Sequence, residues 1–140
     1  MDLRQRSDAS NKQHPDLFIS IHCAATEKNE STVSGAEVYV SRKNTKWSMQ
    51  NKALGSILLN NFSTIYHVSN NEVQQREIGI WVLDNSDCPA ALLECGYITN
   101  ATDLAFIKDP ANQEKIANNI LQAIEKYAAK EIQDTAQKNR

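Results

Sequence analysis

Three apolar stretches of the chain have the length and composition of β-strands. Residues 16–22 and 89–94 are largely apolar with little polar alternation, which is typical of strands covered on both faces in a parallel sheet. Residues 35–41 alternate more and contain β-branched positions, so we predict a strand nearer the edge of the sheet. A short apolar segment at 78–83 and a turn at 84–87 precede the strand at 89–94.

Two further stretches have the spacing of amphipathic helices. Over residues 46–62 the main apolar positions recur at steps of three, four or seven, with Asn44 and Thr45 as candidate caps. Asp109 followed by Pro110 predicts the start of a second helix that packs on the core. Its apolar positions, three to four residues apart, are Ile116, Ile120, Ile124 and Tyr127.

The remaining segments are polar. Two alternatives stand for residues 1–14, either the end of a helix that begins before Met1 or a loose arm, and residues 63–77 indicate an irregular loop. We expect residues 130–140 to fray as a polar tail. The chain is therefore predicted to form one domain over residues 1–129, followed by that tail.

Composition narrows the classes of function. A length of 140 residues with 41% hydrophobic residues supports one domain with a sizeable core. The formal net charge of −2 at pH 7 gives no basic surface of the kind that nucleic-acid-binding proteins show. No stretch approaches the roughly 20 apolar residues that cross a bilayer, and the polar opening lacks the apolar core of a signal peptide. We therefore expect neither a nucleic-acid partner nor a membrane span.

Each of the two most apolar stretches ends on a residue capable of metal or proton chemistry, His22 in the first and Glu94 in the second. A charged group inside a buried strand is costly unless paired, so its place is at the strand end. Ligands of open α/β sheets bind at the carboxyl ends of the strands, so the two residues indicate one site. Taken alone, the two residues favour structural roles, His22 as a satisfied structural histidine and Glu94 as a helix cap or a partner of Arg76.

The three cysteines add no second site. Cys23, Cys88 and Cys95 form no Cys-x-x-Cys pair, so neither a disulfide framework nor a zinc knuckle is indicated. Cys23 follows His22, but adjacent side chains of a strand point to opposite faces, which argues against shared coordination. We expect Cys95 to pack as a small apolar residue.

Five blocks, spread in a consistent order over about residues 3–128, carry a family resemblance. They resemble the zinc-dependent N-acetylmuramoyl-L-alanine amidases, which cleave peptidoglycan. This resemblance implies an α/β fold with a mostly parallel central sheet and helices on both faces. The blocks are residues 16–22, Gly35-Ala-Glu-Val-Tyr39, Arg76, Val82-Leu83 and, as the most specific, Cys88-Pro-Ala-Ala-Leu-Leu-Glu-Cys-Gly-Tyr-Ile-Thr-Asn100.

The resemblance also implies roles for two residues. In this family two histidines and a glutamate hold a zinc ion, and a further glutamate assists the water that attacks the amide. His22 resembles the second zinc histidine and Glu94 the catalytic glutamate. The other two zinc ligands belong to an Asp-Pro-Gly-His-Gly-Gly block and to a later glutamate, and we find no counterpart of either in this chain.

That departure sets expectations for activity. The first strand and helix of the family fold are expected to be missing, so the chain is either a fragment or a naturally short product. A catalytic zinc usually takes three protein ligands, so His22 alone is expected to leave the chain weakly active or inactive. Loss of a strand and a helix would expose an apolar sheet edge, and we expect self-association.

Three other residues are candidate substitutes for the absent ligands. His14 lies at the opposite end of the strand from His22, too far at ~3.3 Å per residue, and is expected on the surface. His67, in the loop after the first amphipathic helix, remains an open candidate. Glu37 either flanks the cleft or is an exposed carboxylate at the sheet edge.

Two functions follow. The first is a zinc-dependent amidase that hydrolyses the amide between N-acetylmuramic acid and L-alanine in peptidoglycan. The alternative is a non-catalytic peptidoglycan-binding or regulatory domain that binds muropeptides without cleaving them. The substrate implied by the resemblance places either protein in the cell envelope, periplasmic or extracellular.

Overall fold

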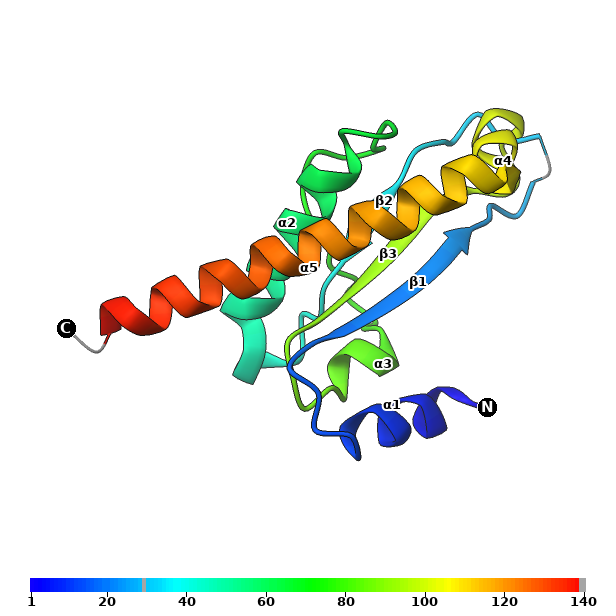
Figure 1. Ribbon diagram of the computed structural model, residues 1–140. Coiled ribbons are helices and arrows are strands. Elements are labelled where there is room, and N and C mark those ends of the chain that lie inside the picture. Colours follow the sequence, from blue (N-terminus) through cyan, green and yellow to red (C-terminus); the bar gives the residue numbers. More distant parts are fainter. Residues whose placement is uncertain (29, 139–140) are drawn as a thin grey trace.

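The computed structural model describes residues 1–28 and 30–138 of the chain. It folds them into a small sheet with helices on either side (Figure 1). The elements in chain order are α1 (Leu3–Asn11), β1 (Phe18–Ala24), β2 (Glu37–Tyr39), the 3-10 turn η1 (Thr45–Trp47), α2 (Ser48–Phe62), α3 (Trp81–Asp84), β3 (Ala90–Tyr97), α4 (Ala101–Lys108) and α5 (Pro110–Lys138).

The sheet has the strand order β1-β3-β2, with β3 at its centre. The two most apolar strands, β1 and β3, pair in parallel, and β2 pairs with β3 in the antiparallel direction. An antiparallel edge strand on a parallel sheet is common in mixed α/β folds. The α/β class is therefore confirmed, with one strand running against the others.

Helices cover both faces of this sheet, as predicted. Ala91, Leu93 and Cys95 of β3 pack into the main core with α2 and α5, because every second residue of a strand faces the same side. Ala90 and Leu92 face the other side and pack against α3. Burial on both faces explains why β3 lacks polar alternation before Glu94. The expectation that Cys95 packs as a small apolar residue is confirmed.

The helix that begins at Pro110 is confirmed. Asp109 caps it, because its Oδ1 accepts a hydrogen bond of 2.8 Å from the N–H of Ala111. This helix, α5, continues to Lys138, where the sequence predicts a fraying tail from residue 130. Lys130 pairs with Asp134 one turn later, which stabilises these last turns. The domain boundary at residue 129 stays a prediction.

The caps predicted for α2 are wrong. The turn η1 precedes α2, whose N-cap is Trp47, and no side chain makes a cap hydrogen bond there. The Asn44 amide instead donates to the carbonyl oxygen of Ser86 at 2.8 Å, so it ties the start of η1 to the segment before β3. The Asn44 side chain, which the local pattern predicts as a helix cap, therefore donates to a backbone carbonyl that is distant in the sequence.

Two other helices differ from expectation. Residues 1–14 fit neither alternative: they contain a helix, but α1 begins at Leu3, with Asp2 and Gln5 in a capping box. The sequence does not predict α4, although Asn100 caps it by accepting from the N–H groups of Thr102 and Asp103.

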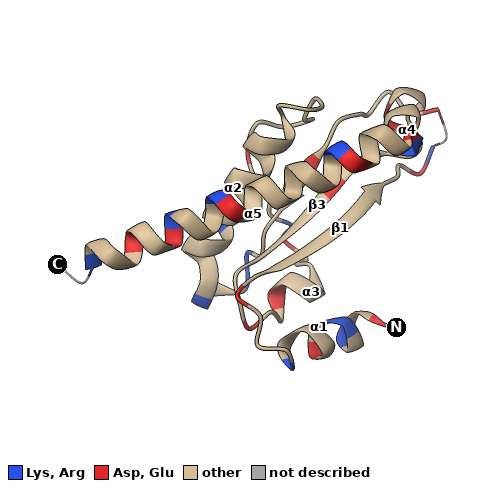
Figure 2. Cartoon of the chain, in the orientation of Figure 1, with Lys and Arg blue, Asp and Glu red and all other residues tan. Residues whose placement is uncertain are grey.

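Charged residues are distributed without a dominant sign. Figure 2 shows acidic and basic residues interspersed along α5.

Over residues 1–28 and 30–138, helices long and apolar enough to cross a bilayer are absent.

Candidate functional site

Glu94 lies at the middle of a row of three residues that crosses the sheet. In the parallel pairing of β1 with β3 its register partner is His22, and in the antiparallel pairing of β2 with β3 its partner is Glu37. Register partners place their side chains on the same face of a sheet. The three side chains therefore share one face, the face on which Ala90 and Leu92 meet α3.

The structure corrects the position of the two predicted site residues. The sequence predicts His22 and Glu94 at strand ends, but β1 continues to Ala24 and β3 to Tyr97. Both residues are only half-buried, although they lie within strands. The helix α3 lies near the start of β3 (Figure 1), so it leaves this later part of the sheet less covered. Incomplete helix cover, rather than a strand end, gives Glu94 access to solvent.

A β-bulge at the end of β3 adds a fourth residue to this face. The register advances from His22 opposite Glu94 to Ala24 opposite Tyr97, so β3 contains one more residue than β1 over this interval. Gly96 within the bulge has a φ of 137°, a conformation that side chains disfavour. The bulge turns Tyr97 onto the face of His22 and Glu94. Gly96 therefore redirects the last residue of β3.

The Glu94 carboxylate lies in an unusual electrostatic environment. Its Oε2 atom is buried and has no hydrogen-bond partner among the described residues. Burial raises the pKa of Glu94; nearby His22 and Arg76 lower this pKa and Glu37 raises it, each by less than burial does. A carboxyl group with a raised pKa is better suited to accept and return a proton than one at its ordinary value.

The imidazole of His22 is oriented by its own strand. The Oγ atom of Ser20 lies 2.9 Å from His22 Nε2, and both residues face the same side of β1 because they are two apart. The hydrogen bond occupies one ring nitrogen and leaves Nδ1 for another partner. Ser20 was not predicted from the sequence, although its position two residues before His22 was a usable signal.

Glu37 flanks Glu94, in agreement with one of the two interpretations of this residue that the sequence allows. Its Oε2 accepts hydrogen bonds from the hydroxyls of Tyr39 at 2.7 Å and Tyr97 at 3.1 Å, and its Oε1 accepts one from Ser69 at 2.7 Å. Burial, followed by the charge of Glu37, raises the pKa of Tyr97 to about 12, so this hydroxyl stays a donor. Three hydroxyls therefore fix the carboxylate of Glu37.

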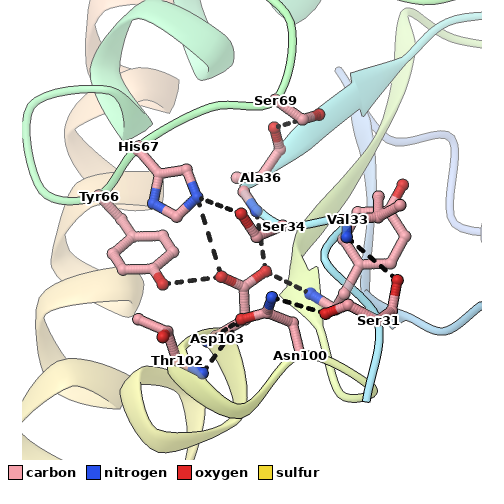
Figure 3. Close-up of polar contacts among 12 residues, drawn as sticks. Ser31, Val33, Ser34, Ala36, Tyr66, His67, Ser69, Asn100, Thr102 and Asp103 are labelled. Carbon is pink, nitrogen blue, oxygen red and sulfur yellow. Dashed lines mark hydrogen bonds and ion pairs between the residues drawn. The ribbon is translucent and has the colours of Figure 1, made fainter. Parts of the chain in front are cut away.

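The other predicted candidates lie elsewhere. His14 is exposed, as expected, and Cys23, also exposed, is a free thiol. His67 contacts Ser34, with 3.0 Å between His67 Nε2 and Ser34 Oγ, and the same nitrogen lies 3.9 Å from Asp103 Oδ1 (Figure 3). A catalytic triad uses the two different ring nitrogens of its histidine. Ser34, His67 and Asp103 therefore do not form a hydrolytic triad.

Asp103 is instead the centre of a buried hydrogen-bond network. Its side chain is fully buried at the first turn of α4 and accepts hydrogen bonds of 2.8 Å from the backbone N–H groups of Gly35 and Tyr97 and from the Tyr66 hydroxyl (Figure 3). The network joins α4, the end of β3 and the segment that enters β2. It therefore holds Tyr97 and β2 beside Glu94.

The residues present do not by themselves fit a catalytic zinc ion. Such a site usually has three protein ligands. Over residues 1–28 and 30–138 no three His, Cys, Asp or Glu side chains are grouped so that they could hold a metal ion. His22 offers one imidazole, and the structure supports no step routed through a metal.

Comparisons with known proteins agree with the geometry. The family model described as N-acetylmuramoyl-L-alanine amidase matches residues 1–126. The chain is 29% identical over 126 residues to the germination-specific N-acetylmuramoyl-L-alanine amidase of Bacillus subtilis strain 168, covering 90% of this chain and 50% of that protein. The chain thus spans about half the length of this curated relative.

Solved structures show the same fold. The CwlD amidase of Clostridioides difficile, solved in complex with the GerS lipoprotein, is 26% identical with a TM-score of 0.78, over 91% of this chain and 61% of that one. An N-acetylmuramyl-L-alanine amidase of Mycobacterium smegmatis, 21% identical, has a TM-score of 0.80 over 91% of this chain and 61% of that one. With its sequence matched over residues 1–126, this chain belongs to the N-acetylmuramoyl-L-alanine amidase family.

Proposed function

We propose that this chain carries part of the active site of an enzyme that hydrolyses the amide between N-acetylmuramic acid and L-alanine in peptidoglycan. The pairing of His22 with Glu94 on adjacent parallel strands is the observation that supports it most directly. Both residues lie on the less covered part of one sheet face, where a substrate can approach. Family membership gives the reaction class.

Glu94 is the proposed catalytic residue. Its half-buried carboxylate has a raised pKa, and no described residue donates a hydrogen bond to it, so it can take a proton from the attacking water and return it to the leaving amine of L-alanine. Glu37 borders Glu94 on the other side, and its carboxylate is already occupied by three hydroxyl donors. Glu94 is therefore the carboxylate of this row with an oxygen available for proton transfer.

His22 is the proposed metal ligand. The family resemblance assigns it to a zinc ion that would supply electrophilic activation of the amide carbonyl when bound. The described residues contribute this single imidazole, whose orientation Ser20 fixes through Nε2. Metal analysis and calorimetric zinc titration of the purified chain, beside His22→Ala, test the assignment. We expect weak, substoichiometric zinc binding by wild type that is lost in His22→Ala, and equal zinc binding by the two proteins would contradict the assignment. Stoichiometric zinc that is lost in His22→Ala would show that His22 has partner ligands in this chain.

The test of the activity is the release of new alanine amino groups from purified peptidoglycan with zinc present. We expect slow release by the wild-type chain, because it supplies one zinc ligand, and none by Glu94→Gln. The matched control is Glu114→Gln, an exposed glutamate of α5, which should behave as wild type. Equal release by wild type and Glu94→Gln would contradict the role of Glu94.

A non-catalytic peptidoglycan-binding or regulatory domain is the alternative. This alternative is supported by the metal ligands that are present. The described residues include one residue assigned as a zinc ligand, His22, and no group of three side chains that could hold the ion. Muropeptide binding without any release of alanine amino groups would assign this alternative to the chain. Either function acts on peptidoglycan and therefore belongs to the cell envelope.

A further inference from the structure

We propose that Arg76 and Tyr39 form a subsite that binds a carboxylate of the peptide that follows L-alanine in the substrate. This inference rests on the proposed function and adds to it the chemistry that recognises the peptide. Arg76 lies in the loop between α2 and α3 and approaches the sheet face beside Glu94.

The guanidinium of Arg76 is held over an aromatic ring. Its central carbon lies 4.5 Å from the centroid of the Tyr39 ring, within the range of a cation–π contact. Tyr39 lies on β2 two residues after Glu37, the register partner of Glu94. The loop thus delivers a positive charge to the same face of the sheet as the proposed catalytic carboxylate.

Tyr39 is itself fixed in place. Its hydroxyl donates to Glu37 Oε2 at 2.7 Å, and Glu37 is held by two further hydroxyls, those of Tyr97 and Ser69. A ring anchored at its hydroxyl provides a rigid platform for a planar guanidinium. Arg76 therefore loses less conformational freedom when it binds a ligand than an unsupported arginine would.

The guanidinium has free binding capacity. Within residues 1–28 and 30–138, no Asp or Glu oxygen lies within the 4.0 Å of a salt bridge from Arg76, whereas nearby Arg42 pairs with Glu77 at 3.2 Å. Arg76 is also exposed. An exposed guanidinium whose N–H donors pair with no carboxylate of the described residues is suited to bind one through two parallel hydrogen bonds.

The position of this charge favours the peptide as its ligand. Arg76 lies over the ring of Tyr39, whose hydroxyl donates to Glu37, the register partner of Glu94, so a carboxylate bound to Arg76 lies within a few residues of the bond that Glu94 serves. The glycan side of that bond carries hydroxyls and acetamido groups and no carboxylate once its lactyl group is joined to alanine. The peptide side carries free carboxylates, beginning with the glutamate that follows L-alanine.

The experiment measures the preference of the full chain for a ligand with free carboxylates. Calorimetric titration gives Kd values for N-acetylmuramoyl-L-alanyl-D-glutamate and for its diamide, which lacks the carboxylates. We expect wild type to bind the acid about tenfold more tightly than the diamide, the size of a charge-assisted hydrogen-bond pair. In Arg76→Met the ratio should fall to about one, and in Arg76→Lys it should be partly retained.

Two further variants separate recognition from general effects. Arg42→Met removes an exposed arginine that already has a partner and should leave the ratio unchanged. Tyr39→Leu removes the aromatic platform and should lower the ratio several-fold. A tenfold ratio that survives in Arg76→Met, or equal binding of acid and diamide by wild type, overturns the subsite. Binding of neither ligand by wild type contradicts the proposed function itself, and the subsite with it.

Discussion

His22 and Glu94 are register partners in the parallel pairing of β1 with β3, so two residues 72 positions apart in the sequence stand side by side on one face of the sheet. The hydrogen-bond ladder between the strands fixes their separation, and neither residue depends on a loop for its position. A site on paired strands is held more rigidly than one on connecting segments.

Burial of the Glu94 carboxylate should lower stability at neutral pH. Burial raises its pKa above the ordinary value of 4.5, which means that the folded state disfavours the ionised form. Glu94→Gln removes that charge, and we expect the free energy of unfolding at pH 7 to rise by about 0.5–2 kcal/mol, the range of such stabilising substitutions. Urea denaturation measures it.

The pH dependence of this gain has a definite sign. The stability associated with protonated Glu94 is fully present below the unfolded pKa and is lost as the pH rises through the raised folded pKa. The difference between Glu94→Gln and wild type should therefore be largest at neutral pH and shrink toward about pH 4. A difference that does not change with pH would argue against charge burial as the cause.

Asp103 should be essential for stability. Asp103→Ala leaves the backbone N–H groups of Gly35 and Tyr97 and the Tyr66 hydroxyl without their acceptor. Unsatisfied buried donors are costly, and we expect a loss of about 3 kcal/mol in the free energy of unfolding. Asp109→Ala, which removes an exposed helix cap, is the control and should cost about 1 kcal/mol. Similar losses in the two variants would disprove the importance of the network.

A side chain at Gly96 should lower the stability of the fold. Its φ of 137° is strained for any other residue, and a Cβ there would lie 3.0 Å from Asp103 Oδ2. We expect Gly96→Ala to lower the free energy of unfolding by about 1–3 kcal/mol in urea denaturation. Ser56→Ala, at an exposed position of α2, should stay within about 0.5 kcal/mol of wild type. An unchanged stability in Gly96→Ala would exclude the strained bulge.

Self-association through β1 is expected at high protein concentration. β1 pairs on one side with β3 and lies at the edge of the described sheet, and Ile21 on it is 57% exposed. Ile21→Lys should weaken association, because a charge on an edge strand opposes strand pairing between molecules. Sedimentation velocity measures the oligomers. Ile132→Lys changes an apolar residue of α5 that is 71% exposed and should leave them unchanged; a monodisperse wild-type monomer would contradict the prediction.

Local sequence determined the elements whose causes are local. The apolar run at 16–22 predicts β1 because burial on both faces excludes polar residues, and Asp109 with Pro110 predicts the start of α5 because the cap acts within one turn. The same patterns identified His22 and Glu94 as residues of interest. The motif around Glu94 also carried the family resemblance, which the comparison over residues 1–126 confirms.

Tertiary structure alone decided what lies beside Glu94. Glu37, Arg76 and Tyr97 reach it through an antiparallel edge strand, a loop and a bulge. Alternation predicts the edge strand but not its pairing with β3, and the loop and the bulge leave no periodic signal in the sequence. The burial of Asp103 likewise depends on donors from segments 37 and 68 residues away. Strand register and hydrogen bonds over such separations follow from the packing of the whole sheet. Local sequence patterns can therefore identify residues of this site but cannot predict how they are arranged.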